Sequence, residues 1–123
     1  MSKHILVVED QEDNRQILHD LLGHAGYELA EARSGKEALA VVAAWRPDLI
    51  LMDMQLPKIS GIEATRRLRA EAATAAIPII AVTSFALSGD DLKAIEAGAT
   101  AYLAKPYSPY ALLGMIRKLL PEA

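Results

Sequence analysis

Short apolar runs alternate along this chain with segments in which apolar residues recur at helical spacing. Four of the runs have the length and composition of buried strands, and a fifth, more mixed run is interpreted as another strand; they cover residues 5–8, 49–52, 79–82 and 101–104, with the mixed run at 27–32. Between them, apolar residues recur every three or four positions, as on one face of a helix. This alternation predicts an α/β fold built on one parallel sheet, with five strands and five helices.

The first helical segment carries signals for its start and its end. Asp13 or Asn14 is expected to cap its N-terminus, because a short polar side chain can accept a hydrogen bond from the first helical N–H groups. Gly26 is placed to end it, since glycine readily adopts the left-handed conformation that follows many helices. We expect its apolar residues to share one face: Ile17, Leu18, Leu21, Leu22 and Ala25.

The four later helices also carry start signals. Ser34 and Ser60 are each followed three residues later by a glutamate, which is the pattern of a capping box. Ser88 with Asp91 resembles this box, and Ser108 stands directly before a proline, a residue favoured at the first helical position. The connections are short, so one domain over residues 1–123 with right-handed crossovers is expected. The residues placed to end the second, fourth and fifth helices are Trp45, Gly98 and Leu120.

Composition excludes several classes of protein. A chain of 123 residues that is 52% hydrophobic and 24% charged is typical of one globular core. Its apolar runs are too short to cross a bilayer, and no signal-like segment follows Met1, so we expect a soluble, cytoplasmic protein with no membrane partner. A net charge of −3 offers no electrostatic basis for binding nucleic acid. The absence of cysteine excludes disulfides and thiolate chemistry.

Polar residues stand where four of the strand-like runs end. Glu9 and Asp10 follow the first run, and Asp53, Thr83 and Lys105 follow the three others. In an open parallel sheet the ligand crevice lies outside the carboxyl ends of the strands, so these side chains should converge. Carboxylates held close together resist joint ionisation unless a cation lies among them, and hard oxygen ligands suit Mg²⁺. The pattern therefore predicts metal-dependent handling of a phosphoryl group.

The segments around these positions resemble the motifs of response-regulator receiver domains. In chain order they are Val7-Val8-Glu9-Asp10, Asp53-Met54-Gln55-Leu56-Pro57 with Gly61, Val82-Thr83-Ser84 and Lys105-Pro106. The resemblance covers essentially the whole chain and is strongest to stand-alone, single-domain regulators. It implies a doubly wound, flavodoxin-like sheet in the order 2-1-3-4-5, flanked by the five helices.

The resemblance also implies a role for each residue of the site. Asp53 matches the phosphoacceptor, whose carboxylate attacks phosphorus to form an aspartyl phosphate. Asp10 and Asp53 match direct Mg²⁺ ligands. Glu9 matches a ligand that acts through water, and Gln55 matches one that uses its main-chain carbonyl. Lys105 is expected to neutralise charge on the phosphoryl oxygens.

A switch is implied as well. Thr83 matches the hydroxyl that donates to the phosphoryl group once Asp53 is modified, and Tyr102 matches the aromatic residue that turns inward as Thr83 moves. Pro106 matches a cis-proline position, and X-Pro is the one kind of peptide bond that adopts the cis form at low cost.

Two residues after Thr83 depart from the commonest pattern of the family. Ser84 stands where a smaller residue is usual, and Phe85 stands where a polar residue is frequent. An apolar ring can block the water that hydrolyses an aspartyl phosphate but cannot orient it. The phosphorylated state is therefore expected to be long-lived.

The function implied is that of a phosphoacceptor in a two-component phosphorelay, which is no enzyme apart from catalysing its own phosphorylation and dephosphorylation. The donor would be a histidine kinase or a histidine phosphotransfer protein, and phosphorylation would alter a surface that binds a downstream protein. Candidate contact residues for that protein or for a dimer are Tyr107, Tyr110, Lys93, Glu96 and Arg117.

Two alternative functions stay open. A Mg²⁺-dependent aspartyl-phosphate phosphatase would have a second carboxylate two residues after its nucleophile, where this chain has Gln55. A pseudo-receiver that binds partners without phosphorylation would lack part of the acidic site, and none of it is missing here.

Other charged residues are interpreted as structural or solvated. The three histidines do not have the spacing of metal ligands: they are His4, His19 and His24. Three arginines of the third helix are interpreted as a solvated face: Arg66, Arg67 and Arg69.

Overall fold

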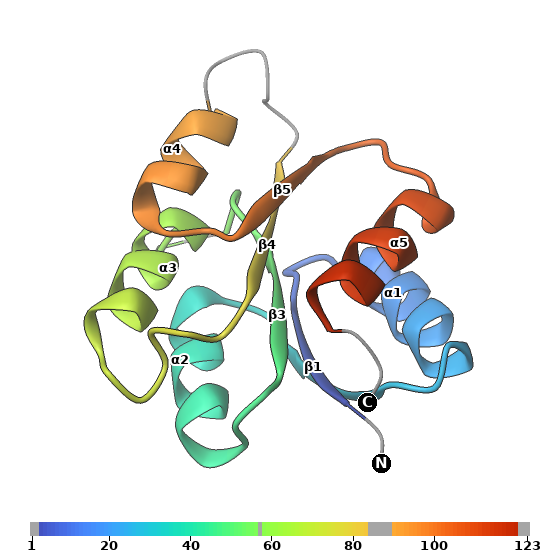
Figure 1. The fold of residues 1–123 in the computed structure, drawn as a ribbon, viewed down its shortest axis with the longest axis horizontal. Coiled ribbons are helices and arrows are strands. Elements are labelled where there is room, and N and C mark those ends of the chain that lie inside the picture. Colours follow the sequence, from blue (N-terminus) through green and yellow to red (C-terminus); the bar gives the residue numbers. More distant parts are fainter. Residues whose placement is uncertain (1–2, 57, 84–89, 121–123) are drawn as a thin grey trace.

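Five parallel strands form one sheet in the computed structural model, which describes residues 3–56, 58–83 and 90–120 (Figure 1). Their order across the sheet is β2-β1-β3-β4-β5, which confirms the predicted topology. The chain adds β2 on one side of β1 and then returns to add β3 on the other side. This reversal opens a crevice at the carboxyl ends of β1 and β3. The strands are β1 (His4–Val8), β2 (Glu28–Ala32), β3 (Leu49–Asp53), β4 (Ile79–Thr83) and β5 (Ala101–Ala104).

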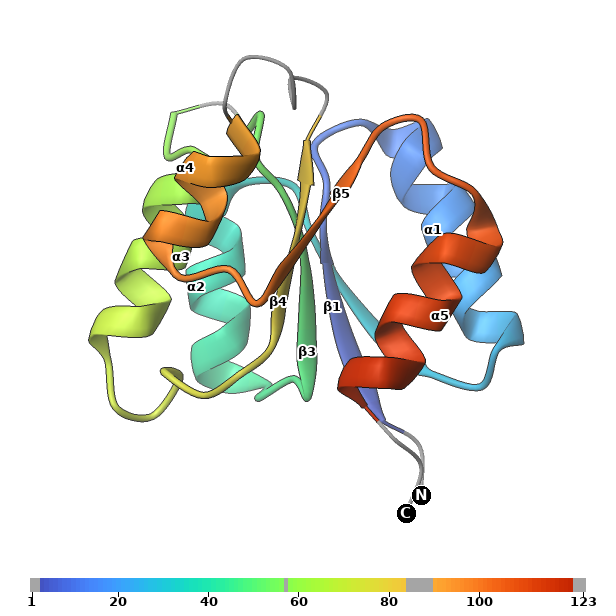
Figure 2. The same cartoon turned by 45° about the horizontal axis from the view of Figure 1, so that its top comes forward.

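Helices cover both faces of the sheet, as parallel strands require (Figure 2). One face carries α1 (Glu12–His24) and α5 (Pro109–Leu119). The other face carries α2 (Gly35–Ala44), α3 (Gly61–Ala70) and α4 (Asp90–Ala97). Two apolar clusters, one on each face, enclose the central strands, and every residue of β3 and β4 is buried. Within the described residues, no helix is both long and apolar enough to cross a membrane.

The start of α1 differs from the prediction. Gln11 is its N-cap, and no side-chain hydrogen bond caps the helix, so Asp13 and Asn14 lie inside the first turn. The Asn14 amide instead donates to the side-chain oxygen of Gln11, at 3.1 Å. Ile17 is also not on the buried face, because 63% of it is exposed, whereas Leu18 and Leu22 pack against the sheet.

The other termini follow the predicted signals. The hydroxyls of Ser34, Ser60 and Ser108 each accept a hydrogen bond from the N–H three residues later, which confirms all three caps. Gly26 and Gly98 have φ of 95° and 116°, so each takes the left-handed conformation that ends its helix. The predicted cap Ser88 lies outside the described residues.

The three arginines of α3 do not form one solvated face. Arg66 and Arg67 pair with Glu63 at the surface, as expected. The Arg69 side chain instead donates to the Gly98 carbonyl at 2.8 Å and to the Thr100 hydroxyl at 3.2 Å, and burial lowers its pKa. Arg69 thereby fastens the turn between α4 and β5 to the end of α3.

A histidine and a tryptophan stack on each other at the end of the sheet opposite the crevice. The His4 ring stacks on Trp45 with ring centroids 4.8 Å apart and an angle of 26° between the planes. His4 Nε2 also lies 2.5 Å from a carboxylate oxygen of Glu28, at the start of β2. These contacts agree with the structural interpretation of this histidine.

Candidate functional site

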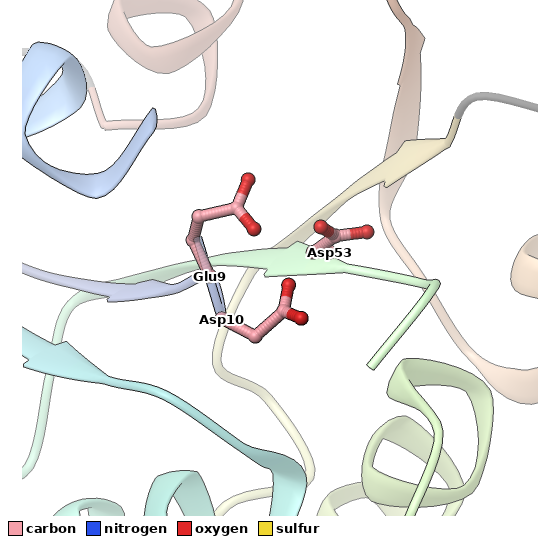
Figure 3. Close-up of side chains that lie close together, drawn as sticks. All are labelled: Glu9, Asp10 and Asp53. Atoms are coloured by element: carbon pink, nitrogen blue, oxygen red, sulfur yellow. The ribbon is translucent and has the colours of Figure 1, made fainter. Parts of the chain in front are cut away.

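Three carboxylates meet at the carboxyl ends of β1 and β3. Glu9 and Asp10 directly follow β1, and Asp53 is the last residue of β3 (Figure 3). The two strands are neighbours in register, with Val8 opposite Met52, so residues after their ends are brought side by side. One oxygen from each carboxylate lies within 4.8 Å of the others. Glu9 and Asp53 are buried, and Asp10 is exposed, so this acidic pocket opens to solvent on the Asp10 side.

Lys105 supplies the positive charge that faces this acidic pocket. Its Nζ lies 3.3 Å from a carboxylate oxygen of Glu9 and 3.3 Å from one of Asp53. The main chain of Lys105 donates to the Thr83 carbonyl at 2.8 Å, which ties the end of β5 to the end of β4. The next peptide bond, to Pro106, is cis, as the resemblance implied.

The pocket holds more negative charge than its one lysine balances. The pKa of Glu9 is raised to about 7, first by burial and then by the hydrogen bond and negative charge of Asp53, while the Gln11 N–H and Lys105 lower it by less. Burial acts to lower the pKa of Lys105, but the Asp53 and Glu9 carboxylates outweigh burial, so this pKa is raised as well. Glu9 therefore exchanges its proton near neutral pH in the metal-free pocket.

Gln55 and Thr83 connect the pocket to the neighbouring loop and strand. The Gln55 main-chain N–H donates to Asp53 Oδ1 at 2.9 Å, so the turn after β3 holds the Asp53 carboxylate. The Gln55 side-chain amide donates to the hydroxyl of Thr83 at 3.3 Å. Thr83 is the last residue of β4 and is fully buried, which fixes its hydroxyl beside the pocket.

A close contact brings the N-terminus of α3 against Asp53. A Cβ atom on Gly61 would lie 2.2 Å from the Asp53 carbonyl oxygen and 2.8 Å from the Met54 Cα. Only glycine fits so close to main chain, which gives a physical reason for Gly61 in the sequence motif. The helix start thus fixes the strand end that carries Asp53.

Other residues of the predicted site are placed differently. Tyr102 lies on β5 with 41% of its surface exposed, so the predicted switch residue faces outward in this conformation. Ser84 and Phe85 lie outside the described residues, and their expected effect on the lifetime of the phosphorylated state stays a prediction.

The donor set fits a hard divalent cation. It consists of oxygens from three carboxylates with an opening to solvent, and their negative charge exceeds the single positive charge of Lys105, an excess that a cation would relieve. Few protein ligands and an open side suit Mg²⁺, which keeps several waters, better than Ca²⁺, which takes six to eight oxygen ligands.

Comparison with known proteins assigns the family. The sequence profile of the response regulator receiver domain matches residues 5–117. The chain belongs to the response regulator receiver family. Among the relatives of this receiver is the polar-differentiation response regulator DivK of Brucella ovis, which is 42% identical over 123 residues, the whole of both chains.

Solved structures of other receivers superpose closely on this one. The receiver domain of the sensor histidine kinase PA1611 from Pseudomonas aeruginosa PAO1 has a TM-score of 0.92 and 34% identity, covering 99% of this chain and 100% of its own. That structure has a magnesium ion coordinated in its active site cleft. The chemotaxis protein CheY4 of Vibrio cholerae has a TM-score of 0.90 and 30% identity, covering 97% and 99%.

Sequence reasoning missed one residue of this receiver's site. Arg15 of α1 is buried, and its guanidinium donates to the Glu9 main-chain carbonyl at 3.0 Å. Its spacing was a usable signal, because residue 15 shares the buried face of α1 with Leu18 and Leu22, three and seven positions later. A charged residue at such a position needs a partner.

A groove adjoins the acidic pocket and was not predicted. It has a volume of about 550 Å³ and lies between α1 and the segment that joins β5 to α5. Glu9 and Lys105 of the acidic pocket also line this groove, and Ile17, Leu21 and Tyr107 contribute apolar walls. Burial raises the pKa of Tyr107, so its phenol stays neutral.

Proposed function

We propose that this receiver accepts a phosphoryl group on Asp53 from a phosphohistidine of a histidine kinase or histidine phosphotransfer protein. The reaction would depend on Mg²⁺, and the phosphorylated state would alter a surface that binds a downstream protein. The observation that carries the proposal is the meeting of Asp53 with Glu9, Asp10 and Lys105 at one strand edge. It supports an intact acceptor site and not a pseudo-receiver.

Asp53 is suited to act as the nucleophile. A carboxylate oxygen would attack phosphorus, the new O–P bond would form as the N–P bond breaks, and the bonding electrons would return to the donor imidazole. The Gln55 N–H holds the carboxyl group in place before attack. Asp10, Asp53, Glu9 and the Gln55 carbonyl would hold Mg²⁺, whose charge would stabilise the oxygens of the transferred group.

Lys105 and Thr83 would recognise the product. Lys105 already contacts Asp53, so its ammonium needs only a short movement to meet the phosphoryl oxygens. The buried Thr83 hydroxyl would donate to another of these oxygens. Since Gln55 engages Thr83 through an amide and offers no carboxylate, the site favours a phosphoacceptor over an aspartyl-phosphate phosphatase.

The apolar groove supports a protein as the donor. Glu9 and Lys105 line both the groove and the acidic pocket, and Lys105 contacts Asp53, so a chain that lies in the groove would bring a phosphohistidine toward Asp53. Ile17 and Leu21 both line the groove, and Ile17 keeps 63% of its surface exposed, so the groove offers an apolar wall for such a chain to cover.

The proposal is tested by incubation with acetyl phosphate, followed by intact-protein mass spectrometry. We expect one phosphoryl adduct in the presence of Mg²⁺ and none after chelation. Asp53→Asn should form no adduct, whereas Asp20→Asn, a control at an exposed aspartate of α1, should react like wild type. An adduct of full stoichiometry in Asp53→Asn would contradict the assignment.

A further inference from the structure

Arg15 is a buried charge whose side chain lies under the turn that carries Glu9 and Asp10. Only 9% of the residue is exposed, and it stands on the face of α1 that packs against the sheet. Arginine is almost never buried in this way unless it is paired. A buried charge at this position needs hydrogen-bond partners, and Glu9 of the acidic pocket and Glu31 of β2 supply them.

The Arg15 guanidinium joins two separate elements. Its Nη1 donates to the Glu9 carbonyl at 3.0 Å, and this hydrogen bond is buried. Its Nε donates to a carboxylate oxygen of Glu31, in β2, at 3.1 Å. The other Glu31 oxygen lies 3.0 Å from His19 Nδ1, so Glu31 is itself held in place.

The main chain of Glu9 is thereby held on both sides. Its N–H donates to the Ala32 carbonyl at the end of β2, at 3.0 Å, and its carbonyl accepts from Arg15. Glu9 comes after the last residue of β1 that pairs with β3, so the ladder between these strands no longer restrains it. The carboxylates of the pocket repel one another, and a turn without these bonds would relax outward.

We propose that Arg15 is a positioning residue of the metal pocket. Its hydrogen bond to the Glu9 carbonyl, braced by Glu31, holds the Glu9–Asp10 turn so that both carboxylates face Asp53. The inference rests on the proposed function only in requiring that the pocket bind a divalent cation. Positioning of ligands by a surrounding shell commonly contributes about ten- to a hundredfold to metal affinity.

Charge and positioning predict opposite effects of removing Arg15. A guanidinium near the pocket repels Mg²⁺, so loss of its charge alone would tighten binding. Loss of the hydrogen bond to the Glu9 carbonyl would weaken Mg²⁺ binding, because the ligands would no longer be arranged in advance. The sign of the change therefore separates the two effects.

The experiment is a calorimetric Mg²⁺ titration of wild type and Arg15→Met. We expect the dissociation constant to rise by about tenfold in Arg15→Met. Arg15→Lys keeps the charge but loses the planar guanidinium, whose Nε and Nη1 meet Glu31 and the Glu9 carbonyl in one fixed geometry, so it should also bind more weakly than wild type. Arg67→Met is the matched control, because Arg67 also pairs with a glutamate but lies exposed on α3, and its affinity should not change.

A second variant covers a failure of Arg15→Met to fold. Glu31→Gln leaves Arg15 in place and weakens the ion pair that orients its guanidinium, so we expect Mg²⁺ affinity to fall by less than in Arg15→Met. Unchanged or tighter binding in whichever of these variants is folded, judged by urea unfolding, overturns the proposal.

A metal-free measurement separates this inference from the proposed function. Hydrogen exchange of the Asp10 and Gln11 amides should be faster in Arg15→Met than in Arg67→Met, with Mg²⁺ chelated. If wild type binds no Mg²⁺, the proposed function fails, and this exchange measurement still tests whether Arg15 holds the Glu9–Asp10 turn. Equal exchange rates in Arg15→Met and Arg67→Met would contradict the proposal that Arg15 holds the Glu9–Asp10 turn.

Discussion

Glu9 is the residue whose ionisation the pocket perturbs most clearly. With its pKa raised from 4.5 to about 7, the folded protein keeps a proton in a pH range where the unfolded chain has lost it. The folded state then binds more protons than the unfolded state, so stability falls as pH rises from about 4.5 to 7.

We expect the metal-free protein to be more stable at pH 5 than at pH 8 because of Glu9. Glu9→Gln should remove much of this difference, on the order of 1 kcal/mol after screening by water. Urea unfolding in the presence of a chelator measures it at both pH values. A pH dependence that is identical in Glu9→Gln would show that other groups cause it.

Asp10 is the exposed carboxylate of the acidic pocket, and it adds to the repulsion between the three carboxylates. Asp10→Ala should make the metal-free protein more stable, because it removes one of three neighbouring carboxylates. Saturating Mg²⁺ should raise the melting temperature of wild type by mass action, and that of Asp10→Ala by less. Equal shifts in thermal unfolding would count against Asp10 as a ligand.

At the scale of helices and strands, the contact between α3 and β3 is the most sensitive to an added side-chain atom. Gly61→Ala would place a methyl group 2.2 Å from the Asp53 carbonyl, and main chain cannot give way cheaply. We expect a loss of about 1–3 kcal/mol in unfolding free energy and slower labelling of Asp53 by acetyl phosphate.

Gly114 is the matched control for that substitution. It lies inside α5, where a Cβ atom would meet no other part of the described structure within 4 Å, so Gly114→Ala should stabilise the protein by about 0.5–1 kcal/mol. Urea unfolding compares the two variants. A Gly61→Ala protein as stable as wild type would show that the helix can shift without cost.

Much of the fold could be predicted because its signals are local. Strand runs, serine caps and terminal glycines each act within a few residues, and the strand-end positions of Glu9 and Asp53 follow from the topology. Partners on other elements could not be predicted. Arg15 was missed although its helical spacing was a usable signal, and nothing local shows that Glu9 and Glu31 would meet it, nor that Arg69 would reach Gly98.

Two errors have the same origin. Periodicity assigned Ile17 to the core because it cannot distinguish an apolar residue that packs inside from one that lines a groove. Propensity assigned the cap of α1 to Asp13 or Asn14, whereas the chain turns into the helix at Gln11. In both cases the surrounding structure overrides a local preference.

For the whole molecule, the proposed switch would connect the pocket to a distant surface. Thr83→Ala should still be phosphorylated on Asp53 but should show a smaller conformational response, because the proposed role of the hydroxyl comes after transfer. NMR spectra with and without beryllium fluoride measure the response at Tyr102 and beyond. Thr83→Ser, which keeps the hydroxyl, is the control, and a full response in Thr83→Ala would contradict the switch.

The stacked pair at the other end of the sheet has a practical consequence. Trp45 is the only tryptophan of the chain, and it stacks on His4 at the start of β1, roughly 16 Å along the strand from the acidic pocket. Its fluorescence should therefore report loss of the sheet and of the His4 contact while staying insensitive to events at Asp53. Emission and mass can thus be recorded on one sample as independent readings of folding and of phosphorylation.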